Sequence, residues 1–176
     1  MAKLTATYTK LLSIIILASF LAVACDNPVN NDEEHPEAEG FVLTSSGVEI
    51  VRYEGGEFAF NDNSEYTHDG QVHVPEGQET PLVRIDFLDP DGNEFSPEDD
   101  GSSLDWQIAD ETIAEIEQHE EDGKWRFHIR GIEEGETTIR FILMHGDHAD
   151  FESLPMPVEV VHSNGDEGNS DHTHTE

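Results

Sequence analysis

Residues 136–143 read Glu-Thr-Thr-Ile-Arg-Phe-Ile-Leu, and this stretch decides the fold. Apolar side chains recur at every second position, at Ile139, Phe141 and Leu143. A period of two with apolar residues on one side is the pattern of a β-strand that covers a core with one face. The stretch therefore predicts a strand over 136–143.

Six further segments between residues 71 and 162 read as short strands. Turn-forming sequences such as Pro90-Asp91-Gly92-Asn93 and Asp122-Gly123 lie between the strands. No amphipathic helical stretch of about 12 residues is visible. Short strands at this spacing predict an all-β fold, an Ig-like antiparallel β-sandwich. The predicted strands are 71–75, 81–88, 104–108, 112–117, 125–130, 136–143 and 156–162.

Three motifs in residues 71–162 resemble bacterial Ig-like domains of the Big2 type. They are Val-Pro-Glu-Gly-Gln-Glu-Thr at 74–80, Asp-Glu-Thr-Ile-Ala-Glu-Ile at 110–116, and Gly-Ile-Glu-Glu-Gly-Glu-Thr-Thr-Ile at 131–139. This family occurs in envelope and surface proteins as spacers, adhesion modules and units that bind carbohydrate or protein. It has no fixed catalytic residues, so the resemblance implies a protein that is not an enzyme.

Residues 41–70 precede the part of the chain that resembles this family. Phe41-Val42-Leu43 and the segment 48–53 read as strands, whereas 61–70 reads as a loop. We expect an N-terminal β extension over 41–70. It is either a hairpin that covers a sheet edge or a small separate addition to the sandwich.

Residues 1–24 are predicted to be a lipoprotein signal peptide. Lys3 and Lys10 precede an uncharged run over 11–24, and Cys25, the single cysteine, follows. The small residues before Cys25 resemble the lipobox of bacterial lipoproteins, although Ala22 stands where that motif usually has leucine. The alternatives are a plain signal peptide or a membrane anchor. As a helix, however, the apolar run would reach about 21 Å, short of the ~30 Å apolar core of a bilayer.

The lipobox resemblance implies a lipid on Cys25, so that the membrane itself is one partner. The protein is then anchored in the cell envelope, at the periplasmic face or on the outer-membrane surface. Residues 25–40 are acidic and lack apolar periodicity, which predicts a disordered tether. Residues 163–176 are rich in His and Asp and are predicted to be a disordered tail. A single cysteine allows no disulfide within the chain, so the apolar core must hold the fold.

Acidic residues dominate the composition. The chain has 8 basic and 40 acidic residues and a formal net charge of -32. Such a field repels nucleic acid, which is therefore excluded as a partner, and attracts cations. The same composition also keeps proteins soluble in high salt, so it does not by itself indicate a cation site.

The loops between alternate strands are the candidate binding region, because an Ig topology gathers three of them at one end. The loop 144–151 has two histidines three residues apart, with one aspartate between them and another two residues after the second, a pattern that suits zinc, copper or nickel. The alternative is an ordinary polar turn. The candidate metal ligands are His145, Asp147, His148 and Asp150, with His119 from a second loop.

Two weaker features complete the candidates. Asp89, Asp91 and Asn93 resemble the start of a calcium loop, although glycine falls at the fourth position rather than the sixth. Arg126 and Arg130 should point outward on one strand with Arg84 beside them. They either compensate the acidic charge or form a docking face for an acidic partner.

The sequence thus predicts a non-catalytic, lipid-anchored envelope protein that binds a divalent transition metal. The alternative is a structural or adhesive Ig-like surface module that contacts a protein or a glycan.

Overall fold

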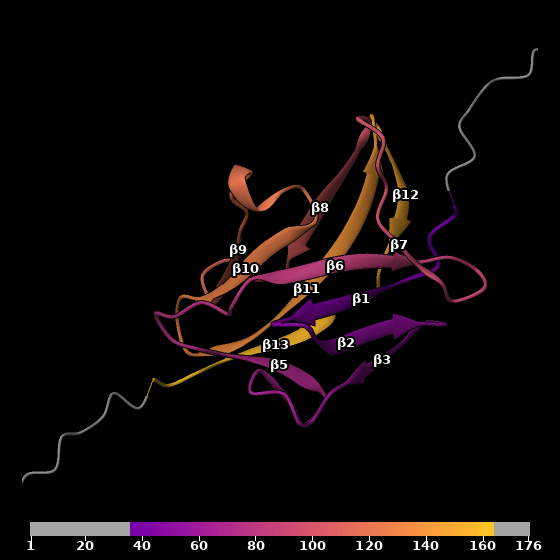
Figure 1. Ribbon diagram of the computed structural model, residues 1–176. Coiled ribbons are helices and arrows are strands. Elements are labelled where there is room, and N and C mark those ends of the chain that lie inside the picture. The colour runs from indigo at the N-terminus through magenta and orange to yellow at the C-terminus, as the bar shows by residue number, and fades with distance from the viewer. Residues whose placement is uncertain (1–35, 164–176) are drawn as a thin grey trace, which may run out of the picture. The chain divides into compact units, whose positions relative to one another are not determined.

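The computed structural model describes residues 36–163, and these form strands β1 to β13 and one short 3-10 turn, Glu120–Asp122. The predicted signal peptide, Cys25, most of the tether and nearly all of the tail lie outside the described residues. Within 36–163, no helix is long and apolar enough to cross a membrane. The strands make two sheets that pack face to face (Figure 1).

The first sheet has the strand order β3-β2-β1-β6-β10-β9, and the short strand β7 pairs with β6. All of its pairings are antiparallel. Its strands are β1 (Gly40–Ser45), β2 (Val48–Glu54), β3 (Glu57–Phe60), β6 (Val83–Leu88), β7 (Glu94–Phe95), β9 (Ala114–Glu117) and β10 (Arg126–Gly131).

The second sheet has the order β12-β11-β13-β5-β4, and β8 pairs with the other edge of β11. One pairing, β5 with β13, is parallel, whereas the others are antiparallel. Its strands are β4 (Thr67–His68), β5 (Gln71–Pro75), β8 (Ser102–Ile108), β11 (Gly135–His145), β12 (His148–Glu152) and β13 (Met156–Val161).

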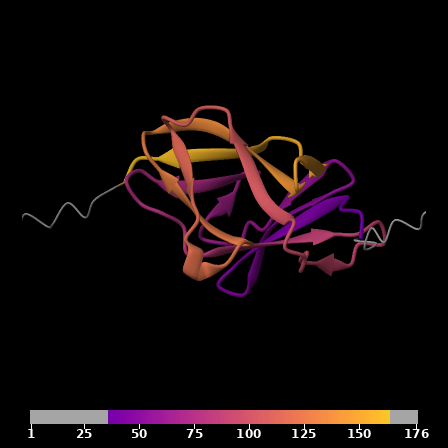
Figure 2. The same cartoon turned by 90° about the horizontal axis from the view of Figure 1, so that it is seen from above.

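The core lies between the sheets and is built around phenylalanine side chains. Phe127 on β10 and Phe141 on β11 are fully buried, and their ring centroids are 5.2 Å apart, so they join the two sheets. Phe41 on β1 packs against Phe141 at 5.3 Å with its ring edge-on. The predicted all-β sandwich is confirmed. Figure 2, which views it from above, shows β1 to β3 (indigo) and β11 to β13 (orange to yellow) on opposite sides.

The N-terminal strands are integrated into the sandwich. β1 lies between β2 and β6, so the hairpin that β1 and β2 form is added to the free edge of β6. Phe41, Leu43 and Ile50 belong to the same buried cluster as the later strands. Residues 41–70 therefore contribute to the common core, while the exact domain boundaries stay a prediction.

Four strands differ from the prediction. β3, β4 and β7 were not predicted, and β4 lies in the segment 61–70, which was expected to be a loop; with two to four residues each, they are too short to show a clear alternation. The segment after β11 was expected to be a loop, but His148–Glu152 forms strand β12, which pairs with the end of β11. The sequence gives no signal for β12, because only Phe151 in it packs against the core.

Candidate functional site

Three loops meet at one end of the sandwich, as the Ig topology predicts. The β11–β12 turn touches the loop before β8, where the backbone N–H of Gly146 donates to the carbonyl of Gly101 at 2.9 Å. The loop before β10 reaches the same place, because the Lys124 ammonium donates to the carbonyls of Asp99 at 2.5 Å and Ser102 at 3.1 Å. The two sheets are thus joined at this end, which lies at the top of Figure 1. We call it the loop end.

The turn between β11 and β12 positions two histidines side by side. His145 and His148 are paired in register across the hairpin, so that only Gly146 and Asp147 form the turn. Gly146 has φ 57°, and Asp147 has no positive φ, which is the pattern of a type II′ turn. Because paired residues project to the same face of a hairpin, the two imidazoles lie together, with ring centroids 5.5 Å apart.

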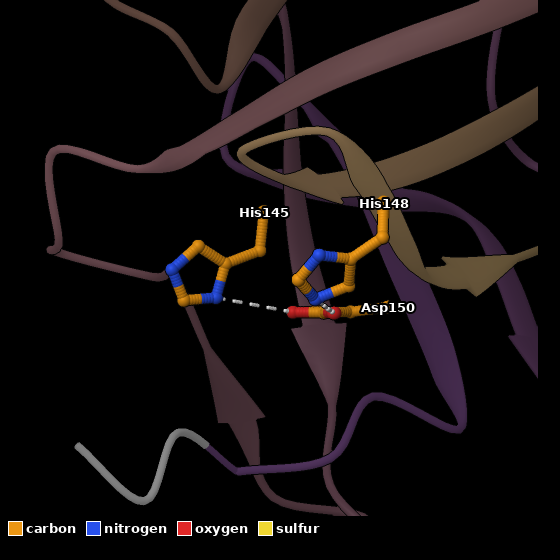
Figure 3. A group of neighbouring side chains, drawn as sticks. All are labelled: His145, His148 and Asp150. Atoms are coloured by element: carbon orange, nitrogen blue, oxygen red, sulfur yellow. Dashed lines mark ion pairs between the residues drawn. The ribbon is translucent and has the colours of Figure 1, made fainter. Parts of the chain in front are cut away.

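Asp150 completes a group of three side chains (Figure 3). The pairing between β11 and β12 shifts between Leu143 and Met144, and Asp150 is the extra residue of this β-bulge. Its Oδ1 lies 3.0 Å from His148 Nε2, and its Oδ2 lies 3.7 Å from His145 Nδ1. One ligand atom from each residue lies within 4.8 Å of the others.

The ring of His145 is supported from behind by the loop before β8. A Cβ on Gly101 would lie 2.8 Å from His145 Cδ2 and 3.0 Å from its Nε2, so a larger residue at 101 would displace the imidazole. The same point is 3.2 Å from Asp99 Oδ1, an oxygen shielded from solvent. In Figure 3 the second nitrogen of His145 points away from Asp150.

This group has the chemistry of a metal site or of a salt bridge. Two imidazole nitrogens and one carboxylate are a usual protein ligand set for zinc, and water can take the remaining positions. Without a metal, Asp150 can pair with either histidine when that histidine is protonated. The side chain of His148 is 70% exposed and that of Asp150 is 32% exposed, so solvent ions reach the group.

The other predicted metal ligands lie apart from these three. Asp147 occupies the turn itself and is exposed, outside the group. His119 lies beside β10, where its ring centroid is 5.8 Å from that of His128. In the part of the chain that the structure describes, no other three His, Cys, Asp or Glu side chains meet as the three at the turn do.

The predicted calcium residues form a tight turn. The Asp89 carboxylate accepts hydrogen bonds from the backbone N–H groups of Asp91 at 2.9 Å and Asn93 at 2.8 Å, and from the Asn93 amide. These bonds, above all the one from the Asn93 side chain, lower the pKa of Asp89. Turn formation accounts for this geometry, and calcium binding stays a prediction.

A groove next to the loop end was not predicted. It has a volume of about 350 Å³ and lies between β6, β10 and the loop before β10. Arg84 and Arg126 are partners across β6 and β10, which agrees with the expectation that they lie side by side. One feature of the sequence could have drawn attention to the groove. Lys124, which lines it, is the single lysine after the predicted signal peptide in a strongly acidic chain. The lining residues are Arg84, Ser96, Asp122, Gly123, Lys124, Trp125 and Arg126.

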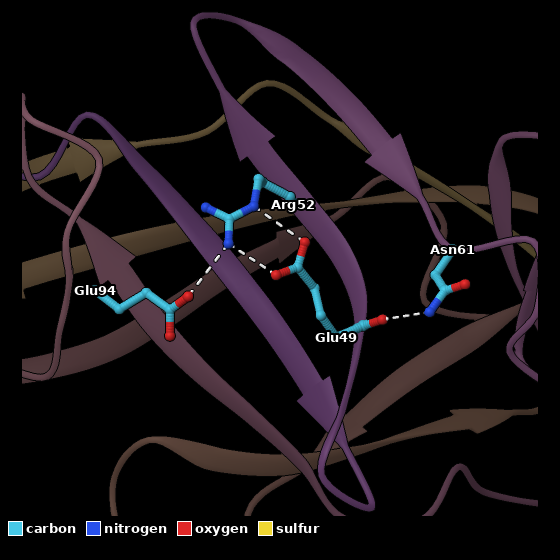
Figure 4. Close-up of polar contacts among 4 residues, drawn as sticks. All are labelled: Glu49, Arg52, Asn61 and Glu94. Carbon is cyan, nitrogen blue, oxygen red and sulfur yellow. Dashed lines mark hydrogen bonds and ion pairs between the residues drawn. The ribbon is translucent and has the colours of Figure 1, made fainter.

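Arg52 on β2, unlike the cations of the groove, is paired with two carboxylates (Figure 4). Its guanidinium binds both carboxylate oxygens of Glu49, at 3.0 and 2.7 Å, and one oxygen of Glu94 at 3.2 Å. The hydrogen bond to Glu49 raises the pKa of Arg52. Asn61 donates to the Glu49 carbonyl at 2.8 Å. This arginine ties β2 to β7 and compensates local acidic charge.

Comparison with known proteins gives a distant structural similarity. No family model and no curated protein matches the sequence, so the Big2 and lipoprotein resemblances stay predictions. Two solved structures are similar to 53% of this chain: domains 4 and 5 of the S-layer protein SbsC, at 21% identity, and its domains 5-6, at 22%. The match covers 48% and 40% of those chains, and both TM-scores are 0.36. Scores this low support no inference about function.

Proposed function

We propose that this protein is a non-catalytic module of the cell envelope, tethered through Cys25, that serves a structural or adhesive role by contacting a protein or a glycan with its loop end. The observation that carries the proposal is the joining of three loops from both sheets. Hydrogen bonds from Gly146 and Lys124 hold the loop end together. Loops fixed by a rigid scaffold are the usual place for recognition.

Charge and sequence support the same proposal. The uncharged run before the only cysteine is typical of a signal peptide for export, and the cysteine is a candidate for lipid attachment in the envelope. The net charge of -32 keeps such a protein soluble and away from nucleic acid.

Co-sedimentation with isolated envelopes of the producing cells tests the proposal. The protein is residues 25–176 with Cys25→Ser, so that lipid cannot contribute. We expect saturable binding that heat unfolding of the protein abolishes, since a folded surface is needed. Retention of the lipidated protein alone, with no saturable binding of the Cys25→Ser form, would show that the domain contacts nothing and would refute the proposal.

A second candidate function is supported by the group at the β11–β12 turn. His145, His148 and Asp150 would hold a divalent transition metal, zinc, copper or nickel, with waters completing the coordination. Because this candidate uses a part of the loop end, a bound ion would also stiffen the turn that links the sheets.

Calorimetry with zinc at pH 7.5 tests this candidate. We expect one site per chain, and the double substitution His145→Ala/His148→Ala should weaken binding by at least ~100-fold. Asp147→Asn is the matched control, because Asp147 lies in the same turn but outside the group. Binding should also weaken at pH 5.5, since protonated imidazole cannot ligate. Equal affinities of wild type and the double variant would exclude the site.

A further inference from the structure

Within residues 36–163, two basic side chains have no carboxylate within ion-pair distance, although the chain has 40 acidic residues. The four other basic residues after the predicted signal peptide each pair with at least one carboxylate: Arg52, Arg84, Arg130 and Arg140. Among the residues that the structure describes, none brings a carboxylate within ion-pair distance of Lys124 or Arg126. Their donors instead reach backbone carbonyls, as in the 3.2 Å bond from Arg126 to Asp122.

These two cations line one groove together with Arg84. Arg84 and Arg126 stand directly opposite each other on β6 and β10, an arrangement that costs free energy between like charges. Only Arg84 is neutralised, through its ion pair with Asp86. A chain with so many acidic residues has ample means to neutralise both. The retained positive charge therefore points to an anionic group that comes from outside the chain.

Trp125 lines the groove and is partly buried against the core. Its indole N–H donates to the Pro97 carbonyl at 3.0 Å, and its ring packs edge-on against Phe87 with centroids 5.6 Å apart. The Lys124 ammonium lies 5.2 Å from the ring centroid. The indole is therefore held in place, with the cation over one face of the ring, so that a ligand must use the other face or the exposed edge.

We propose that this groove binds a carboxylate-bearing sugar, such as a uronic acid unit of a surface polysaccharide. Lys124 and Arg126 would hold the carboxylate through charge-assisted hydrogen bonds. Trp125 would pack against the apolar face of the sugar ring, while Asp122 offers hydrogen-bond acceptors to its hydroxyls. The inference rests on the proposed contact role of the loop end and names the class of its ligand.

The overall charge of the protein restricts which anionic ligands the groove can bind. A net charge of -32 repels dense polyanions at long range. At physiological salt the screening length is about 8 Å, so at contact the cations of the groove outweigh distant carboxylates. A sugar chain with isolated carboxylates suits this balance better than a nucleic acid.

Tryptophan fluorescence tests the inference. The chain has two tryptophans, so the substitution Trp106→Phe leaves Trp125 as the single reporter. Titration with trigalacturonate should change its emission saturably, whereas the neutral trisaccharide galactotriose should not. Arg126→Gln should weaken binding by at least ~10-fold, because it removes a hydrogen bond to a charged group. Arg130→Gln is the matched control, since Arg130 lies on the same strand but pairs with Glu117 outside the groove.

Four results would overturn the inference. They are no saturable change with trigalacturonate, equal binding of galactotriose, equal weakening in Arg126→Gln and Arg130→Gln, and tighter binding of a triglutamate peptide than of the sugar. If trigalacturonate fails while the protein still sediments with envelopes, only the groove inference falls. If sedimentation is also absent, the proposed function falls as well.

Discussion

At the scale of single residues, Phe141 holds the two sheets together. It is fully buried and contacts Phe41 and Phe127 from the facing sheet. We expect Phe141→Ala to lower the free energy of unfolding by about 3–5 kcal/mol, because it leaves a cavity between the layers. Urea unfolding measures this, with Ile132→Ala at an exposed position as the control. A loss below ~1 kcal/mol would show that the rings do not carry the core.

At the scale of elements, the strands that alternate cleanly were predictable. β5, β6, β8, β9, β10, β11 and β13 all fall on predicted segments, because one of their faces is buried and the period of two is visible. β12 was not predictable, since it is an edge strand whose residues are mostly exposed. Its pairing depends on the tight turn at Gly146 rather than on its own composition.

The candidate site was predictable only in part, because residue spacing is visible in the sequence whereas strand register is not. The spacing of His145 and His148 identified the turn, and the topology brought the three loops together. Asp150, which was predicted, joins the histidines through a bulge whose register the sequence does not reveal. Asp147 was named for its place between the two histidines, and His119 for its place in a loop expected at the same end. The side chain of neither joins the group. The groove depends on cross-strand register and on missing ion pairs, which sequence patterns do not contain.

At the scale of the whole molecule, the acidic charge and the arrangement of the loops have different consequences. The acidic composition favours solubility, and the hydrogen-bonded loops form the surface that we propose as the contact surface. The metal group lies at the loop end on β11 and β12, and the basic groove lies next to the loop end on β6 and β10. Both sites contact the loop before β8, because Lys124 donates to the Asp99 and Ser102 carbonyls while Gly101 packs against His145. Substitutions of Lys124 and His145 should therefore not be additive.

The most direct test of the central claim is amide hydrogen exchange of residues 25–176, Cys25→Ser, alone and bound to isolated envelopes. We predict that binding slows exchange in segments 97–102, 122–125 and 145–148 of the loop end. Exchange in the turn 131–135, at the opposite end of β10, should stay the same. Slower exchange confined to 131–135, or no change in any of the three loops, would contradict the proposal that the loop end is the contact surface.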